Sequence, residues 1–297
     1  MKLNRALDDF RWAVRLSFLF SRFQWSIRAT FKTGVILSFV NSILGLLNWF
    51  FIGSMFRSVQ VASLENYDQN YLAYVFLGNF IGTVFGAGGF FSPAGFFQRG
   101  IFGPDFKRWS MSPTDPLLYN LVANRILNFV GYTLTNIIIQ FIVVFFVFGH
   151  FFDIHFNIRF SMMPLAIVYL FYAAIAQIFY ETLMSSVFLH SYALRAVNEN
   201  VLAGLLATIG RIVSGQDFPI EALPKWLQYF SWIFPRAQGL IGARYLFSAD
   251  AETSALFWPR LIVLTVQFFA YGALGIWLVQ SGIRKVRRDG LVQVPPA

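Results

Sequence analysis

The sequence predicts an all-α integral membrane protein, and three of its properties lead to that prediction. Apolar residues make up 57% of the 297-residue chain, and charged residues make up only 12%. A soluble domain of this size needs a larger charged surface. The apolar residues also gather in windows of about 20 residues, the length that spans roughly 30 Å of hydrocarbon as a helix. We therefore expect one transmembrane domain over residues 1–297.

The apolar windows predict six transmembrane helices, because a segment in lipid must satisfy its own backbone hydrogen bonds. The windows lie near residues 34–56, 71–91, 121–148, 160–187, 198–214 and 258–283. The fifth window is the shortest and contains Arg211, so an arrangement with five spans is an alternative.

The basic residues predict how the bundle is oriented. Most of the 23 lysines and arginines lie in the first 32 residues, in the loop after the second window and in the tail after the sixth. Cytoplasmic loops carry such an excess, so both termini are expected in the cytoplasm and the protein in the cell (cytoplasmic) membrane. The formal charge of +9 then reflects orientation and attraction to lipid headgroups. No nucleic-acid partner is expected, because no basic cluster lies in a soluble module.

The first 32 residues predict an amphipathic helix at the membrane interface. Arg11, Arg15 and Arg22 share one strip of a helical projection, and aromatic and aliphatic residues flank them. Such a helix lies flat, with its arginines among the lipid phosphates. Because arginines interrupt the segment, we do not expect a cleaved signal peptide.

The chain offers little material for catalysis or metal binding. It contains no cysteine and three histidines. His150, Asp153 and His155 have the residue types of a metal site, but two imidazoles on a short loop are too few for a zinc site with three protein ligands. Glu181 and Arg211 are expected near opposite interfaces and therefore unpaired. We predict no catalytic residues, no metal site and no cofactor bound by this chain, and expect that it is not an enzyme.

Polar residues with helical spacing mark faces that avoid lipid. Asn79 and Thr83 share a face of the second window, where Gly82 and Gly86 form a GxxxG pattern that permits close helix packing. The candidates for a translocation path are Asn79, Thr83, Thr208 and Arg211. The alternative for the polar residues is that they serve packing between helices. For Arg211 the alternative is that its side chain snorkels to the membrane interface.

A proline-rich aromatic stretch separates the fifth and sixth windows. The sequence GQDFPIEALPKWLQYFSWIFPRAQ begins a region, 215–257, that is too long for a turn and too aromatic for a soluble loop. We expect re-entrant external helices here, interrupted by prolines and dipping into the outer leaflet. The residues that define this element are Pro219, Pro224, Trp226 and Pro235.

Two stretches resemble a known family. The run FPIEALPKWLQYFSWIFP, followed by GARYLF, resembles the signature before the last span of ABC-2 type permeases, the membrane subunits of ATP-binding-cassette exporters. The run WSMSPTDPLLYNLVANRIL, residues 109–127, resembles the cytoplasmic loop after the second span of that family. The basic amphipathic start and the long last external loop are similar as well.

The resemblance implies a permease subunit that forms an export path with a second copy or a related chain. A separate ATPase subunit would bind ATP and Mg, because this chain has no P-loop of its own. The resemblance also implies that residues 96–116 are the coupling loop, and the expected ATPase contacts are Phe106, Trp109, Met111 and Pro113. The alternatives are a channel or assembly factor, or a lipid-processing membrane enzyme, without an ATPase partner.

Overall fold

A computed structural model describes most of the apolar segments of the chain. The described residues are 32–55, 71–86, 134–151, 158–190, 208–247 and 254–288, with single positions between 8 and 26. The described positions between Asp8 and Ser26 are all helical, and Trp12, Phe18 and Leu19 among them are exposed. Almost all of the described residues are in helices, as the sequence predicts.

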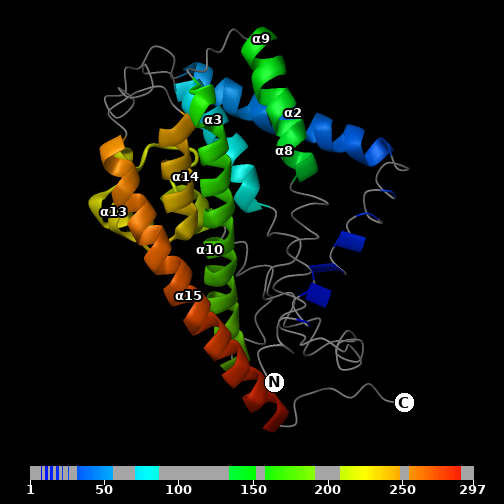
Figure 1. Ribbon diagram of the computed structural model, residues 1–297. Coiled ribbons are helices and arrows are strands. Elements are labelled where there is room, and N and C mark those ends of the chain that lie inside the picture. The colour runs from blue at the N-terminus through cyan, green and yellow to red at the C-terminus, as the bar shows by residue number, and fades with distance from the viewer. Residues whose placement is uncertain are drawn as a thin grey trace.

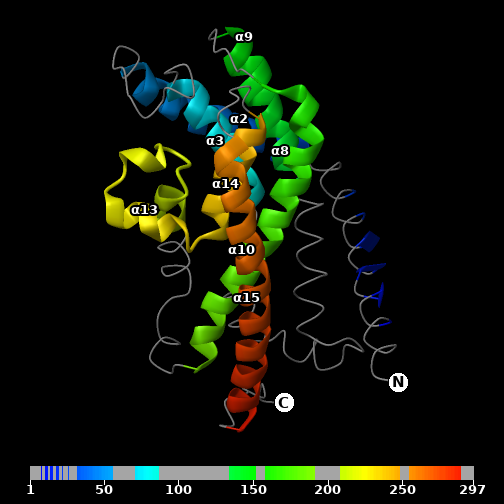
Figure 2. The ribbon, with the colours of Figure 1, turned by 60° about the vertical axis from the view of Figure 1, so that its left-hand side comes forward.

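Two long helices form the axis of the molecule. Helix α10 covers Met163–His190 and helix α15 covers Ser254–Arg288. At 1.5 Å per residue their lengths are about 42 and 52 Å, enough to cross a bilayer. They pack side by side (Figures 1 and 2), and the Cβ that an alanine would place at Gly275 would lie 3.4 Å from the Leu183 backbone nitrogen.

Shorter apolar helices surround one end of this pair. They are α2 (Lys32–Met55), α3 (Tyr71–Gly86), α8 (Leu134–Phe141), the π-helix η6 (Ile142–Phe148) and α9 (Gly149–Phe151). Their aromatic side chains interlock, for example Phe76 with Phe148 at 4.7 Å between ring centroids. Helix α2 runs at a steep angle to α10 and α15 rather than parallel to them (Figures 1 and 2).

The segment between the fifth and sixth windows folds back into the body of the protein. Residues 208–213 are helical, and the 3₁₀ turn η8 (Ile220–Ala222), α13 (Lys225–Ser231) and α14 (Pro235–Phe247) follow. The prolines Pro219 and Pro224 directly precede η8 and α13, and Pro235 is the first residue of α14, the favoured position of proline in a helix. Helix α13 projects to the side (Figure 2), whereas α14 lies between α3, α10 and α15 and is buried along almost its whole length.

The outer surfaces of α10 and α15 are apolar. From Trp258 to Trp277 every exposed residue of α15 is apolar, and the same holds for the described side chains of α10. Thr182 and Ser186 of α10 and Gln267 of α15 are polar and buried. This pattern is the reverse of that in a water-soluble protein, and it is suited to lipid.

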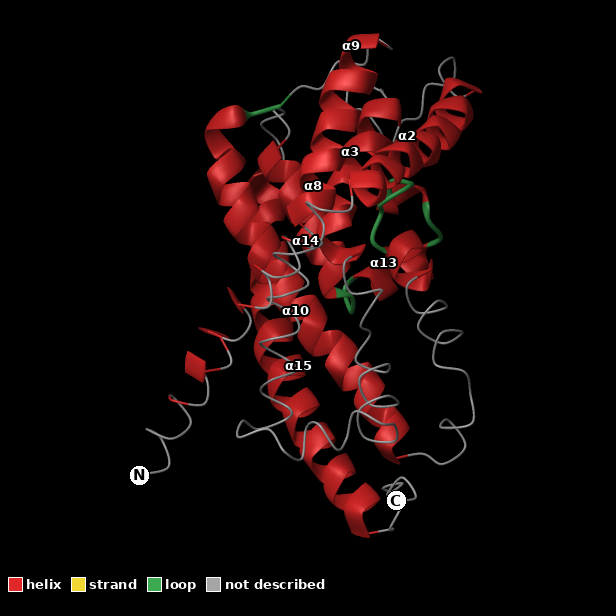
Figure 3. Cartoon of the chain, turned by 90° about the vertical axis from the view of Figure 1, so that its right-hand side faces the viewer, coloured by secondary structure: helices red, strands yellow, loops and turns green. Residues whose placement is uncertain are grey.

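The structure confirms that the described chain is mostly helical (Figure 3), and its apolar helices agree with a membrane protein without settling the number of spans. Within the described residues, α10 and α15 are the two helices long and apolar enough to span a membrane, and they match the fourth and sixth windows. Shorter apolar helices, Phe39–Ile52, Tyr71–Phe85 and Asn136–Phe148, lie in the first three windows. The count of six spans stays a prediction.

Candidate functional site

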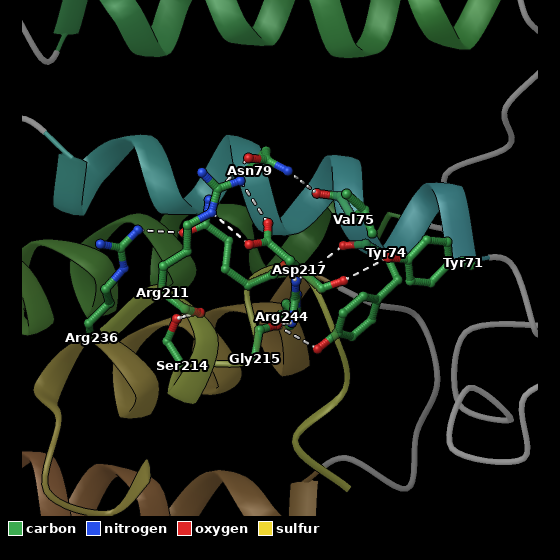
Figure 4. Close-up of polar contacts among 11 residues, drawn as sticks. Tyr71, Tyr74, Val75, Asn79, Arg211, Ser214, Gly215, Asp217, Arg236 and Arg244 are labelled. Carbon is green, nitrogen blue, oxygen red and sulfur yellow. Dashed lines mark hydrogen bonds and ion pairs between the residues drawn. The ribbon is translucent and has the colours of Figure 1, made fainter. Parts of the chain in front are cut away.

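The candidate site is built around a buried turn, residues 214–217, which ends the helical stretch 208–213. Gly215 has a φ of +70°, a conformation that glycine adopts without strain. A side chain there would also collide with Ile220, whose Cγ1 lies 2.8 Å from the position of a Cβ. The Tyr74 hydroxyl donates a hydrogen bond of 2.6 Å to the Gly215 carbonyl, so α3 fixes the turn from one side (Figure 4).

Arg244 of α14 holds the same turn from within the protein core. Its side chain is 1% exposed, and its guanidinium donates hydrogen bonds to the carbonyls of Gly215, Gln216 and Tyr74. The guanidinium also lies over the Tyr74 ring, 3.7 Å from the centroid, where a cation is attracted to the ring face. Glycine at position 78 makes room, because a Cβ there would clash with the guanidinium and with the Gln216 carbonyl.

Arg211 binds the last residue of the turn. Its Nε and Nη2 donate to the two carboxylate oxygens of Asp217 at 2.6 and 2.9 Å, a bidentate pair. The Asp217 side chain is 8% exposed, whereas that of Arg211 is 39% exposed and lies 5.5 Å from the centroid of the Trp49 ring. Arg211 therefore has a paired side and an open side.

Arg236, the second residue of α14, contacts the 214–217 turn through its side chain. Its Nη2 donates to the Gln216 side-chain oxygen, and Gln216 Nε2 donates to Asn79 Oδ1 at 3.0 Å. The backbone nitrogen of Arg236 donates to Oε1 of Gln177 in α10, which satisfies one of the free donors at the start of the helix. Burial and then the charge of Arg211 lower the pKa of Arg236 to about 10, so it stays protonated at neutral pH.

The site therefore brings three guanidinium groups to one turn of four residues (Figure 4). The carboxylates whose charges act on Arg236 are Asp217, already paired with Arg211, and Glu181, which accepts a hydrogen bond from Gln177. The Nε atoms of Arg236 and Arg244 are buried and have no hydrogen-bond partner among the described residues. Chemically, this arrangement provides cationic hydrogen-bond donors in a region that is largely shielded from water.

The described residues offer no alternative metal centre, since none of them form a group of three or more His, Cys, Asp or Glu side chains. His150 lies at the end of the helical region that starts at Leu134, and its predicted neighbours Asp153 and His155 lie outside the described residues.

The structure brings some of the residues predicted to line a translocation path to this site. Asn79 contacts Gln216, and Arg211 binds Asp217. Thr83 instead donates to the Asn79 carbonyl of its own helix, and Thr208 is exposed. Glu181 and Arg211 were expected near opposite interfaces, but the charges of both act on Arg236, so they lie in the same region. Their hydrogen-bond partners differ, Gln177 for Glu181 and Asp217 for Arg211.

The remaining predicted residues divide between the re-entrant segment and the coupling loop. Pro219 and Pro235 are buried, whereas Pro224 and Trp226 are exposed. The expected ATPase contacts Phe106, Trp109, Met111 and Pro113 lie outside the described residues.

Sequence reasoning missed the residues that organise the turn. Arg244 stands in a short apolar run, GLIGARYLF, where a charged residue is costly, and this cost was the available signal. Gly78 precedes Gly82 by four residues on one face of α3, so the two together could have indicated a close approach. At Gly82 the neighbour is the Gln216 side chain, 2.7 Å from the position of a Cβ, rather than the backbone of a packed helix.

Comparison with known proteins identifies no relative of this chain: no family model matches it, and no curated protein or solved structure is significantly similar.

Proposed function

We propose that this protein is the membrane-spanning permease subunit of an ATP-driven exporter of the ABC-2 type. In this proposal two copies, or two related chains, form the translocation path, and a separate ATPase subunit binds ATP and Mg and supplies the energy. The chain itself is not an enzyme. It lies in the cell membrane with six spans and with both termini in the cytoplasm.

The observation that carries the proposal is the position of α14. The family signature that the sequence resembles ends in a re-entrant segment directly before the last span. Here the segment 208–247 folds back, and α14 is buried against α3, α10 and α15 immediately before the long α15 begins. Arginine side chains are costly inside a membrane protein, so a packed helix with two arginines directly before the last span indicates a function beyond crossing the membrane.

The apolar outer surfaces of α10 and α15 support the membrane part of the proposal. Leu165, Val168 and Phe171 on α10 and Ile262, Val266 and Phe269 on α15 are all exposed. In water such a continuous surface would drive aggregation, whereas in lipid it costs nothing.

The aromatic surface of α13 supports insertion into one leaflet. Trp226, Tyr229 and Phe230 are exposed, while Gln228 turns inward and donates to the Leu223 carbonyl at 2.8 Å. Tryptophan and tyrosine favour the boundary between headgroups and acyl chains. Helix α13 therefore anchors the re-entrant segment at the external interface.

The decisive test is co-purification with an ATPase. If Trp109 is a coupling contact, Trp109→Ala removes a buried anchor and weakens the complex by tens of fold, roughly 2 kcal/mol. We expect the variant to insert normally but to retain little ATPase subunit and to transport slowly. Trp12→Ala in the interface helix is the matched control and keeps its ATPase. A wild type that is never isolated with a Walker-type ATPase would contradict the proposal and favour a channel, an assembly factor or a lipid-processing enzyme.

The orientation has its own test, because the chain contains no cysteine. Single cysteines at Ser112 and Ser248 are expected on the cytoplasmic and external sides, respectively. A membrane-impermeant thiol reagent added to intact cells should label Ser248→Cys and not Ser112→Cys. The opposite result would invert the orientation.

A further inference from the structure

Two arginines in the site have hydrogen-bond donors that holding the turn does not use. Asp217 engages Nε and Nη2 of Arg211 and leaves Nη1 outside the pair. Gln216 engages Nη2 of Arg236, while the Nε of Arg236 has no partner among the described residues. Arg211 and Arg236 thus each have an unused donor, and the one carboxylate drawn at the site, that of Asp217, is bound to Arg211 alone (Figure 4).

Among the described residues, the arginines that contact the turn outnumber the carboxylates whose charges act on Arg236. Arg211, Arg236 and Arg244 contact the turn, and the carboxylates that act on Arg236 are Asp217 and Glu181. Charges interact strongly where water is largely excluded, so an anion bound beside Arg211 and Arg236 would be strongly attracted. An anionic group with two or more oxygens has the acceptors to take hydrogen bonds from both guanidinium groups.

Aromatic side chains adjoin the open side of Arg211. Trp49 packs edge to face against Phe218, with 6.5 Å between ring centroids, and Phe218 also contacts Tyr71 at 6.3 Å. Phe218 is 44% exposed although it neighbours the buried turn. A charged region and an apolar aromatic wall therefore meet at Arg211, as the recognition of an amphipathic molecule requires.

We propose that Arg211 and Arg236 bind the anionic headgroup of an amphipathic lipid through its phosphate or carboxylate oxygens, while Trp49 and Phe218 contact its apolar part. This inference rests on the proposed transport function for its physiological meaning, since it assigns the cargo class as anionic amphiphiles. The binding site itself requires no ATPase. Asn79 belongs to it indirectly, as a positioning residue that orients Gln216.

The test compares the lipids that the purified full-length protein retains. The protein is reconstituted into nanodiscs with equal amounts of phosphatidylglycerol and phosphatidylcholine of the same acyl chains, and lipids that remain bound after detergent extraction are counted by native mass spectrometry. We expect the wild type to retain phosphatidylglycerol with a preference of about tenfold, the effect of one or two charge-assisted hydrogen bonds. Arg236→Gln should bring this preference close to equality.

Two further variants separate recognition from folding and from bulk charge. Arg236→Lys keeps the positive charge but not the planar fork, so it should keep only part of the preference, and a wild-type preference in Arg236→Gln would overturn the proposal. Arg284→Gln removes an exposed arginine near the end of α15 and should leave the preference unchanged. If Arg284→Gln reduces the preference as much as Arg236→Gln does, the lipid is attracted by net charge and the site is refuted.

Excess inorganic phosphate distinguishes a free anion from a headgroup. Retention of phosphatidylglycerol in its presence supports an amphipathic ligand, whereas its complete displacement would overturn the lipid assignment. ATPase co-purification, measured on the same samples, separates the two proposals. If the preference for phosphatidylglycerol depends on Arg236 but no ATPase co-purifies, the lipid site is supported and the exporter proposal is rejected. If the ATPase co-purifies but the protein shows no preference for phosphatidylglycerol, the exporter proposal stands and the lipid site is rejected.

Discussion

Helices α14 and α15 follow one another in the chain, but they place their residues in opposite environments. Helix α14 is enclosed by its neighbours and buries Gln238 and Arg244, whereas α15 exposes Trp258, Val266 and Phe269 along its outer face. In a water-soluble protein the enclosed helix would be the more apolar one. The difference shows that polar side chains of this protein lie inside the helix bundle and apolar ones lie on its surface. Of the two helices, the one with the higher hydropathy is therefore the one with the exposed outer face.

The enclosed helix depends on Arg244, and its loss is the largest effect we expect. Arg244→Leu removes the donor from the Gln216 carbonyl and leaves a gap against Tyr74, so it should lower the free energy of unfolding by about 4 kcal/mol. Unfolding of the purified protein in mixed micelles measures this. Arg288→Leu, at an exposed position in the last turn of α15, is the control and should change little. Equal stability of the two variants would show that α14 does not depend on its arginine.

A charged residue introduced on the exposed face of α15 should disfavour membrane insertion, whereas a water-soluble helix would tolerate it. Phe269 is 67% exposed near the middle of the apolar part of α15. Phe269→Lys should disfavour insertion by about 3 kcal/mol if this surface faces lipid, and the protein should be lost from the alkali-resistant membrane fraction. Gln280→Lys, exposed towards the end of the same helix, should insert normally. Improved solubility without loss of insertion would place the surface in water instead.

A smaller effect tests how closely α3 approaches the enclosed region. Gly78→Ala forces the Arg244 guanidinium and the Gln216 carbonyl to move, and it should cost about 2 kcal/mol of stability. Gly45→Ala in α2 is the matched substitution, because a Cβ there meets nothing within 4 Å. It should be neutral within about 0.5 kcal/mol. Thermal unfolding of the two variants measures the contrast, and no difference between them would contradict the packing of α3 on the turn.

The smallest effect concerns the partly exposed pair of Arg211 and Asp217. A double-mutant cycle with Arg211→Gln and Asp217→Asn should give a coupling energy of about 1 kcal/mol, because solvent screens the open side of Arg211. Chemical denaturation of the four proteins provides the values. A coupling energy near zero would show that the pair does not stabilise the protein, which would favour the alternative in which Arg211 snorkels to the membrane interface.

The fold could be predicted from the sequence where hydropathy is the deciding property. The windows at 160–187 and 258–283 coincide with α10 and α15 because long apolar runs in lipid have no alternative to the helix. The prolines also predicted breaks correctly, since Pro219, Pro224 and Pro235 each stand at the start of a helical segment. The steep angle of α2 could not be predicted, because composition fixes the length of a helix and not its direction.

The site was less predictable, because it depends on contacts between distant parts of the chain. Asn79 and Arg211 stood out as polar residues in apolar windows, so the sequence identified them. Arg244 bonds carbonyls that lie 28, 29 and 170 residues away, and carbonyl partners leave no mark in the sequence. Asp217 lies in the segment after the fifth window, and its pairing with Arg211 leaves no mark in the sequence.

The hydrogen bonds of Arg244 also have a mechanical consequence. One guanidinium joins the carbonyl of Tyr74 in α3 to those of Gly215 and Gln216 in the turn, while its own backbone belongs to α14. These three elements are thereby cross-braced, so α3 cannot slide past α14 without breaking buried bonds. Any conformational change of the protein would therefore have to move α3, the turn and α14 together or break these hydrogen bonds.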